Sequence, residues 1–237
     1  MSDPFGLVGK NILVTGGTRG IGREVVRLLA PSWRVLVGGR SEAAVAAVVA
    51  ECPDAAGFVC DLADEDAVAS TVAELELGAS GLDAVVHSAG VVGYGSVEDT
   101  TRSDWRHVLE LNVVAVSDLT RLLLPALRSA GGTVVVVNSG SGFNAGANGA
   151  VYAASKFAVR AWADSLRAEE RGWVRVSSVH PGRVDTDMQR ELQAAEGREY
   201  DPSIAMEVTS VARAIVFALE APADAAVESL SIRPTSA

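Results

Sequence analysis

Tyr152 and Lys156 have the clearest potential for chemistry in this sequence, because they stand four residues apart and both residue types are rare. The chain has three tyrosines and only two lysines, Lys10 and Lys156. Side chains four apart lie on the same face of a helix, so the ammonium group of Lys156 can lie beside the phenol of Tyr152. A tyrosine titrates near pKa ~10, and a neighbouring cation stabilises its phenolate. The pair is suited to proton transfer, although a core tyrosine beside a surface lysine would give the same pattern.

A glycine-rich loop, "TGGTRGIG" at residues 15–22, joins an apolar run to the helical pattern "REVVRLLA". Its glycines permit positive φ angles and let the backbone approach a pyrophosphate, which the free amides and dipole of a helix N-terminus attract. The spacing G-x-x-x-G-x-G is a variant of the usual G-x-G-x-x-G dinucleotide pattern, and a tight turn with spare glycines is the alternative. We predict a phosphate cradle whose contacts are Gly16, Thr18, Arg19, Gly20, Ile21 and Gly22.

The end of the second apolar run indicates which dinucleotide would bind. Proteins that prefer NAD place an acidic residue at about this position for the ribose 2′-hydroxyl, whereas a nearby arginine accommodates the 2′-phosphate of NADP. This chain has Gly39 followed by Arg40, and Arg19 offers a second guanidinium for phosphate oxygens. The pattern favours NADP(H) over NAD(H), unless these arginines are solvated surface groups.

Seven short runs rich in β-branched residues alternate with longer helical patterns along the chain. Most runs are continuously apolar, as in "VVVVN" at residues 134–138, which is typical of strands buried on both faces of a parallel sheet. The predicted strands are Asn11–Thr15, Arg34–Gly38, Gly57–Cys60, Asp83–His87, Thr133–Asn138, Arg175–Val179 and Val227–Ile232.

The segments between these runs carry apolar residues at the three- and four-residue spacing of amphipathic helices. Strand and helix therefore alternate, which predicts the α/β class: a Rossmann-like, doubly wound parallel sheet of about seven strands with helices on both faces. Ligands bind such sheets at the carboxyl ends of the strands. The predicted helices are Ile21–Leu29, Glu42–Ala50, Glu65–Leu77, Ser103–Ser129, Ala150–Arg171 and Glu207–Glu220.

Length and composition narrow the classes of function. With 237 residues, 49% of them hydrophobic, the chain is expected to form one domain over residues 1–237. A net charge of −10 opposes binding to nucleic acids or anionic membranes. Cys52 and Cys60 lack metal-ligand spacing and are too few for a disulfide framework, which predicts no metal site and a reducing compartment. The N-terminus lacks a signal-peptide pattern and no run of eighteen apolar residues occurs, which predicts a soluble, cytoplasmic protein.

Seven motifs stand in the order in which they occur in the short-chain dehydrogenase/reductase superfamily, and nearly the whole chain resembles its short, one-domain branch. The resemblance implies an oxidoreductase that exchanges a hydride between a nicotinamide and a carbonyl or alcohol carbon of a small molecule. The motifs are "TGGTRGIG" at 15–22, "DLAD" at 61–64, "HSAG" at 87–90, "LELNVVA" at 109–115, "NSGSG" at 138–142, "YAASK" at 152–156 and "HPGRVDT" at 180–186.

The resemblance implies a catalytic set of Asn112, Ser139, Tyr152 and Lys156. Tyr152 would be the general acid or base, and Lys156 would also bind the ribose of the nicotinamide. Ser139 would hydrogen-bond the substrate oxygen, with Ser141 as its rival by residue type. Asn112 would hold a water against the lysine and continue the proton relay.

The resemblance also implies cofactor contacts beyond the glycine loop. The family usually has Asn before the Ala-Gly of the motif at residues 87–90, where this chain has Ser88. The hydrogen bonds that steady the central strand must then be made by other groups or through water. The implied contacts are Asp61 and Leu62 at the adenine, Ala89 and Gly90 at the cofactor floor, and Pro181, Gly182, Val184 and Thr186 at the nicotinamide carboxamide and pyrophosphate.

The leading hypothesis is an NADPH-dependent carbonyl reductase or the corresponding alcohol dehydrogenase. A protein that binds NADP(H) as a sensor or scaffold without turnover is a second hypothesis, against which the complete catalytic set argues. A nucleotide-sugar epimerase or dehydratase is a third, against which the short stretch after Lys156 argues. Substrate identity, stereochemistry and direction of reaction stay open.

A polar lid at residues 188–205 is expected to order over the substrate. Its Arg190, Arg198 and Tyr200 give a weak indication of a polar or anionic substrate, and solvated lid charges are the alternative. The expected lining of the substrate site is Gly93–Gly95, Phe143–Gly149 and Met188–Ser203.

Association into a homo-oligomer is also expected, through the helices Ser103–Ser129 and Ala150–Arg171. The sequence does not distinguish a dimer from a tetramer.

Overall fold

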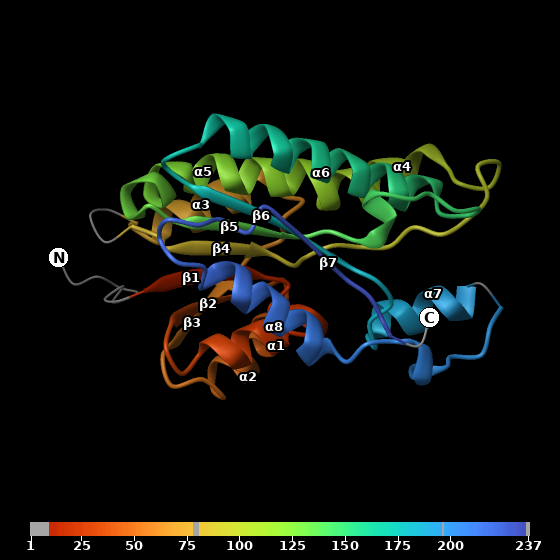
Figure 1. Cartoon of the computed structure of the whole chain (residues 1–237), viewed down its shortest axis with the longest axis horizontal. Helices are drawn as coiled ribbons and strands as arrows, with labels where there is room; N and C mark the ends of the chain where they lie inside the picture. Colours follow the sequence, from red (N-terminus) through yellow and green to blue (C-terminus); the bar gives the residue numbers. More distant parts are fainter. Residues whose placement is uncertain (1–9, 78–80, 196, 236–237) are drawn as a thin grey trace.

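The computed structural model describes residues 10–77, 81–195 and 197–235 (Figure 1). The first nine residues, which belong to the N-terminus argued to lack a signal peptide, lie outside the described residues, as do the ends of the predicted domain. Within the described ranges, no helix is long and apolar enough to cross a membrane.

All seven strands lie in one parallel sheet, in the order β3-β2-β1-β4-β5-β6-β7. This confirms the predicted Rossmann-like, doubly wound sheet. The order reverses between β1 and β4, so the site where ligands bind such sheets lies at the carboxyl ends of these two strands. The strands are β1 (Asn11–Thr15), β2 (Arg34–Gly39), β3 (Ala55–Val59), β4 (Ala84–His87), β5 (Thr133–Val137), β6 (Arg175–Pro181) and β7 (Ser229–Ile232).

Helices cover both faces of the sheet (Figure 1), which is why its central strands are apolar along their whole length. Val26, Val45 and Ile215 belong to the core on the face covered by α1, α2 and α8. Val68 and Leu123 belong to the core on the opposite face, under α3, α5 and α6. The helices are α1 (Gly20–Leu29), α2 (Glu42–Val49), α3 (Glu65–Glu74), α4 (Arg102–Leu109), α5 (Ala115–Ala130), α6 (Ala150–Glu169), α7 (Asp187–Ala195) and α8 (Val208–Leu219).

The predicted helix Ser103–Ser129 is divided in the structure. Between α4 and α5 the chain forms a π-helix, η1 (Glu110–Val114), in which the amide of Ala115 donates to the carbonyl of Glu110, five residues earlier. Such a widened turn is rare and occurs mostly at functional sites. Here it contains the buried Asn112.

Residues 188–195 of the predicted polar lid belong to α7 (Asp187–Ala195), a helix that was not predicted from the sequence. Its polar composition concealed the helical spacing of Met188 and Leu192, which stand four apart. On the other side of the helix, Arg190 forms ion pairs with Asp185 and Asp187. Two short 3₁₀ helices, η2 (Gly140–Gly142) and η3 (Pro202–Ile204), complete the described elements.

His87, the last residue of β4, is buried below the sheet edge that carries the site. Its Nε2 lies 2.8 Å from Oγ1 of Thr120, and that hydroxyl already donates to the carbonyl of Val116 at 2.7 Å. The imidazole must therefore donate through Nε2, and its buried Nδ1 has no hydrogen-bond partner among the described residues. Burial lowers the pKa of His87 to about 4.

This buried histidine predicts an acid-sensitive stability. An unfolded histidine titrates near pKa ~6.5, so between that value and about 4 the unfolded state binds more protons than the folded state. The free energy of unfolding should therefore fall as the pH is lowered through this window, by about 1.4 kcal/mol for each pKa unit of difference. His87→Gln cannot take up the proton, so its stability should decline less steeply in urea denaturation at pH 7, 5.5 and 4.5.

The exposed His107 in α4 provides the control for this experiment. His107→Gln should follow the wild-type pH dependence. A wild-type slope in His87→Gln would contradict the assignment.

Candidate active site

A cavity of about 1180 Å³ opens at the carboxyl ends of the strands. Its walls come from the segments after β1 to β6 and from one face of α6, as the fold predicts. The predicted residues Gly22 and Asn112 do not line it. The predicted residues that do are Gly16, Thr18, Arg19, Gly20, Ile21, Arg40, Asp61, Leu62, Ala89, Gly90, Ser139, Tyr152, Lys156, Pro181, Gly182, Val184 and Thr186.

The glycine loop has the geometry of a phosphate cradle. Gly16 and Gly20 adopt positive φ angles of 63° and 53°. Gly22 begins the packing of α1 under the loop, since a Cβ there would lie 2.3 Å from the carbonyl oxygen of Gly16. At Gly20 a Cβ would meet only the Thr186 side chain, at 3.6 Å, so the loop leaves space on its cavity side. These residues fit a dinucleotide, whose pyrophosphate would lie at the N-terminus of α1.

Where the family usually has Asn, this chain has Ser88, and hydrogen bonds at the end of the central strand are made by Thr15. The Thr15 hydroxyl oxygen accepts from the amides of Ser88 and Ala89, each at 3.1 Å. This joins the end of β1 to the segment after β4, directly beneath Gly16, where a Cβ would approach Ala89 to 2.9 Å. The cavity floor is therefore held by β1 itself.

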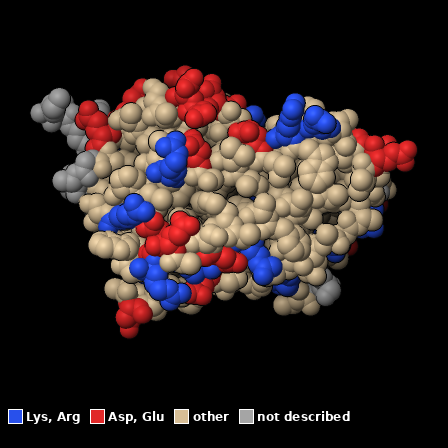
Figure 2. All heavy atoms as spheres, turned by 90° about the horizontal axis from the view of Figure 1, so that it is seen from above, with Lys and Arg blue, Asp and Glu red and all other residues tan. Residues whose placement is uncertain are grey.

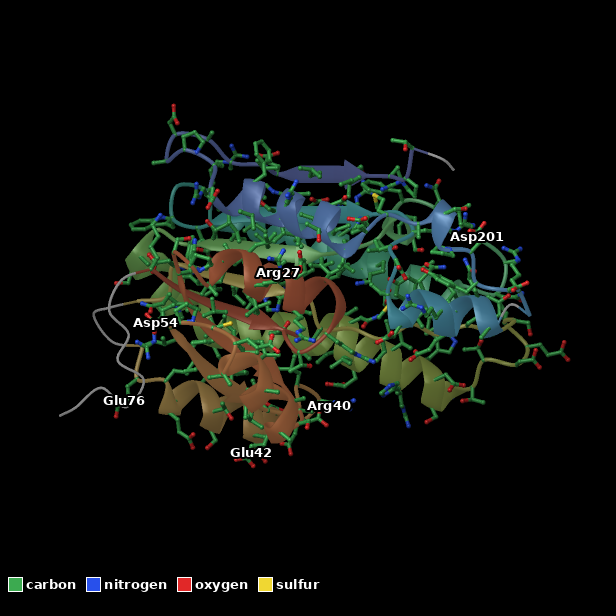
Figure 3. The ribbon with its side chains drawn as sticks, turned by 90° about the horizontal axis from the view of Figure 1, so that it is seen from below. Arg27, Arg40, Glu42, Asp54, Glu76 and Asp201 are labelled. Carbon is green, nitrogen blue, oxygen red and sulfur yellow. The ribbon has the colours of Figure 1, made fainter. Side chains whose placement is uncertain are left out.

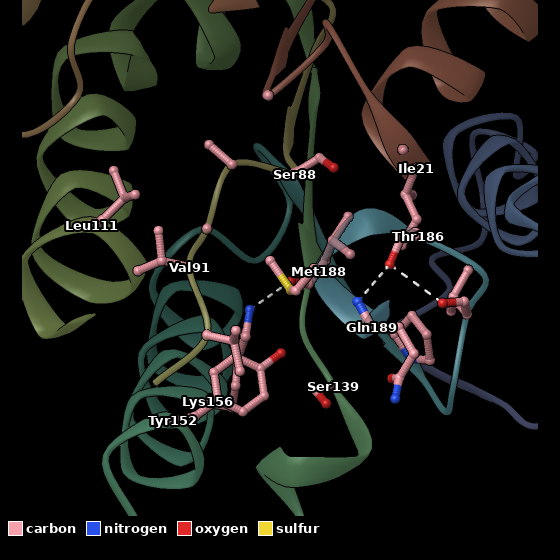
Figure 4. Close-up of a pocket in the computed structure, with 18 of the residues that line it drawn as sticks. Ile21, Ser88, Val91, Leu111, Ser139, Tyr152, Lys156, Thr186, Met188 and Gln189 are labelled. Atoms are coloured by element: carbon pink, nitrogen blue, oxygen red, sulfur yellow. Dashed lines mark hydrogen bonds between the residues drawn. The ribbon is translucent and has the colours of Figure 1, made fainter. Parts of the chain in front are cut away.

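Tyr152, Lys156 and Ser139 meet at one wall of the cavity (Figure 4). Tyr152 and Lys156 lie on the first turns of α6, with the Lys156 ammonium 5.7 Å from the centre of the tyrosine ring. Ser139 follows β5 and lines the same wall, close enough to Tyr152 for its hydroxyl to lower the pKa of the phenol. Ser141 also lines the cavity, and its amide donates to the Ser139 hydroxyl at 3.1 Å. Of the two serines, Ser139 is the one that acts on the pKa of Tyr152.

Burial dominates the electrostatics of this group. It raises the pKa of Tyr152, and the hydrogen bond from Ser139 opposes that rise. It lowers the pKa of Lys156 to about 8, while the Lys156 ammonium donates to the carbonyl of Val137 at 3.1 Å. Burial therefore keeps the tyrosine protonated near neutral pH. The expected stabilisation of its phenolate by Lys156 stays a prediction.

Asn112 lies behind this wall, and its side chain is engaged on three sides. The amide group donates to the carbonyl of Val91 and accepts from the Val91 amide, each at 2.9 Å. It also donates to the hydroxyl of Ser155 at 3.1 Å, which in turn donates to the carbonyl of Tyr152. Asn112 therefore braces the catalytic wall, and its role in a proton relay stays a prediction.

Sequence reasoning missed two buried polar residues that position the site. Ser155 links Asn112 to the first turn of α6, and Asn138 joins the end of β5 to the same helix. The Asn138 side chain donates to the carbonyl of Lys156 at 3.2 Å and accepts from the Ser139 amide at 2.8 Å. A signal was present in both cases, since each is a polar residue at the end of an apolar stretch.

Arg19 and Arg40 lie at the end of the cavity formed by the loops after β1 and β2. Arg40 stands between β2 and the first turn of α2, which begins at Glu42 (Figure 3). Both side chains are exposed, and neither is within ion-pair distance of a carboxylate among the described residues. Gly39 stands in the position where an acidic residue would meet a ribose, and a Cβ there would lie 2.8 Å from the side chains of Thr18 and Val45.

The opposite end of the cavity contains part of the expected substrate lining. Two loops are tied together there, because the Gly95 amide donates to the Asn148 carbonyl and the Asn148 side chain donates to the Tyr94 hydroxyl. The expected Arg190, Arg198 and Tyr200 do not line the cavity, and Arg183 and Arg233, which were not predicted, do. The expected residues that line it are Gly93, Tyr94, Asn144, Gly146, Ala147, Gly149, Met188, Gln189 and Leu192.

Comparison with known proteins gives a consistent result. A family model described as short chain dehydrogenase matches residues 10–197. The chain is 35% identical over 190 residues to an L-fucose dehydrogenase from Bos taurus, covering 79% of this chain and 70% of that protein. It is 33% identical over 205 residues to a 3-alpha-(or 20-beta)-hydroxysteroid dehydrogenase from Mycobacterium tuberculosis strain CDC 1551, covering 83% and 79%. An actinorhodin polyketide ketoreductase solved with NADPH has a TM-score of 0.87 at 26% identity, covering 95% of this chain and 96% of that one.

The packing of Gly22 predicts the outcome of a substitution. Gly22→Ala should lower the free energy of unfolding by about 1–3 kcal/mol, because the added methyl group meets the backbone of Gly16 and the loop must move. Gly146→Ala is the matched control, since no atom lies within 4 Å of a Cβ at that position. Urea denaturation of both variants measures the effect. Equal stability of Gly22→Ala and wild type would show that the loop yields without cost.

Proposed function

The chain belongs to the short-chain dehydrogenase/reductase family, and on this premise we propose that it transfers a hydride between NADP(H) and the carbonyl or secondary alcohol group of a small molecule. Tyr152 is the general acid in reduction and the general base in oxidation. Members of this family are oxidoreductases that act on alcohol and carbonyl groups, and nicotinamide cofactors are typical of them.

The observation that carries this proposal is the meeting of Tyr152, Ser139 and Lys156 at one cavity wall. In the reducing direction the phenol of Tyr152 donates its proton to the substrate oxygen, and the Ser139 hydroxyl holds that oxygen in place. The raised pKa of Tyr152 keeps the proton available near neutral pH. The bound nicotinamide supplies the hydride to the carbonyl carbon.

Lys156 supports the proton transfer in two ways. Below its pKa of about 8 the ammonium group is charged, and it lies on the same helix face as Tyr152, where it stabilises the phenolate that remains after transfer. It also binds the ribose of the nicotinamide, which places cofactor and proton donor in one frame. Asn112, through Ser155 and Val91, fixes the wall on which this geometry depends.

Preference for NADP(H) over NAD(H) is supported by three residues after β1 and β2. Arg19 and Arg40 line the same end of the cavity, and two guanidinium groups suit a 2′-phosphate. Gly39 leaves no carboxylate to accept the 2′-hydroxyl of NAD at that position. The ketoreductase with the same fold was solved with NADPH.

Two other functions are less well supported. A sensor or scaffold that binds NADP(H) without turnover has no use for a tyrosine and a serine aligned at the substrate end of the cavity. A nucleotide-sugar epimerase or dehydratase of the longer branch usually carries an added substrate domain. The superposition with the ketoreductase instead covers 95% of this chain and 96% of that one.

A homo-oligomer through α5 and α6 is part of the proposal. Val114, the last residue of η1 before α5, and Phe157 on α6 are exposed large apolar side chains. On the face of the molecule that carries these helices, charged side chains surround a central area of other residues (Figure 2). Association through this area would cover apolar surface at little cost in desolvated charge.

Removal of the Tyr152 hydroxyl tests the reaction directly. Tyr152→Phe should reduce kcat for carbonyl reduction by about 10²- to 10⁴-fold, because the proton donor is lost. The NADPH dissociation constant should stay close to that of wild type, since the ring still fills its place in the wall. NADPH oxidation with a panel of aldehydes and ketones measures the first quantity, and fluorescence titration measures the second.

Tyr200→Phe is the matched control, because its hydroxyl bonds to Asp185 outside the cavity. This variant should turn over like wild type. Turnover by Tyr152→Phe at the wild-type rate would contradict the role given to Tyr152. NADPH binding without turnover of any carbonyl would favour the sensor function.

The cofactor preference has its own test in Arg40. Arg40→Gln should raise the NADPH dissociation constant about tenfold, through loss of hydrogen bonds to a charged phosphate, and leave the NADH constant unchanged. Arg171→Gln, which removes the same charge from an exposed position after α6, should change neither constant. Equal affinity of the wild type for NADH and NADPH would remove the roles given to Arg19 and Arg40.

A further inference from the structure

Arg233 follows the last strand, β7, and lines the cavity at the end opposite to Arg40. Its guanidinium lies against Gly140, where a Cβ would be 3.3 Å from Nη2 and 3.6 Å from Cζ. Gly140 is the residue after Ser139, which faces the substrate oxygen in the proposed reaction. A cation therefore stands one residue away from the reacting group.

Main-chain groups hold this side chain in place. One guanidinium nitrogen, Nη1, donates to the carbonyl of His180 and to that of Ile232. The aliphatic stem lies against Gly182, where a Cβ would be 3.0 Å from the Arg233 Cδ. Because the position is fixed before a ligand arrives, little conformational entropy remains to be lost on binding.

The charge of Arg233 is not neutralised within the described part of the chain. No carboxylate lies within ion-pair distance of it, in contrast to Arg190, which pairs with Asp185 and Asp187. The Tyr200 hydroxyl is likewise taken, by Asp185. Arg190 and Tyr200, which the sequence suggested for an anionic substrate, are thus both engaged by Asp185 and do not line the cavity.

The cavity as a whole is basic although the chain carries a net charge of −10. A cleft lined by one sign of charge attracts ligands of the opposite sign. The proposed cofactor contacts account for Arg19, Arg40 and Lys156. Of the two remaining cations, Arg183 and Arg233, Arg233 lies against Gly140. The charged lining residues are Arg19, Arg40, Lys156, Arg183 and Arg233 against Asp61 and Asp187.

We infer that Arg233 binds a carboxylate of the substrate, so that the reaction converts an oxo acid into a hydroxy acid; the substrate class rests on the proposed function. The carboxylate accepts hydrogen bonds from the guanidinium beside Gly140, while the carbonyl oxygen lies between Ser139 and Tyr152. The carbonyl carbon gains the hydride of NADPH, its oxygen gains the proton of Tyr152, and NADP⁺ and the hydroxy acid are the products.

Equilibrium binding tests the carboxylate site without relying on turnover. Butanoate, hexanoate and octanoate, each beside its uncharged amide, would be titrated by calorimetry into the protein saturated with NADP⁺. The wild type should bind at least one acid more tightly than its amide. In Arg233→Gln the ratio of acid to amide affinity should fall about tenfold, because hydrogen bonds to a charged group are lost. Arg233→Lys, which keeps the charge but not the fork, should retain part of it.

Arg171→Gln is the matched control and should retain the full ratio of acid to amide affinity. Thermal unfolding and the NADPH dissociation constant of Arg233→Gln establish that the variant is folded. If it does not fold, Arg233→Lys provides the comparison, with a smaller acid-to-amide ratio expected. The same ratio in the folded variant and wild type, or no preference for any acid, would overturn the inference.

Turnover separates this inference from the proposed function. A series of oxo acids and their methyl esters would be assayed for NADPH oxidation, with kcat/KM expected to fall in Arg233→Gln for acids only. Reduction of esters and acids alike, with no effect of Arg233, removes the carboxylate site and leaves the proposed function. Arg233-dependent binding of carboxylates without reduction of any member of the series would support the carboxylate site and contradict the proposed function.

Discussion

The parallel direction of all seven strands is the constraint on which the rest of this structure depends. Every strand ends at the same edge, so residues from distant parts of the sequence meet there, and backbone groups beyond the last paired residues need other partners. Side chains provide them. The Thr15 hydroxyl accepts from the amides of Ser88 and Ala89, and the Asn112 side chain pairs with both main-chain groups of Val91. These hydrogen bonds tie the floor of the cavity to the sheet from which it opens.

The sequence was sufficient for the sheet and for most of the residues that line the cavity, because both depend on local patterns. Continuously apolar runs marked the buried strands, and the spacing of Tyr152 and Lys156 placed both on one face of α6. The parts that it did not predict depend on distant contacts. Asn112 was assigned a catalytic role from its motif, but its partners Val91 and Ser155 are 21 and 43 residues away. No short-range pattern could have placed Arg233 beside Gly140.

Charge is distributed differently over the surface and over the cavity. The chain as a whole is acidic, and an acidic exterior repels polyanions such as nucleic acids. Inside the cavity the arginines after β1, β2 and β7 outnumber the carboxylates, so the lining attracts a small anion although the chain as a whole is acidic.

The π-helix η1 changes the direction in which side chains point between α4 and α5. One residue of an α-helix corresponds to a rotation of about 100°, and η1 accommodates an extra residue without ending the helix. The apolar side of α4 can therefore face α6, while the apolar side of α5 faces α3 and the sheet. Asn112 stands at the junction of these two orientations. Deletion of a single residue from η1 would leave α4 and α5 helical, but it would turn the packing face of one of them toward solvent. Insertions and deletions in this segment should therefore be far rarer in evolution than substitutions.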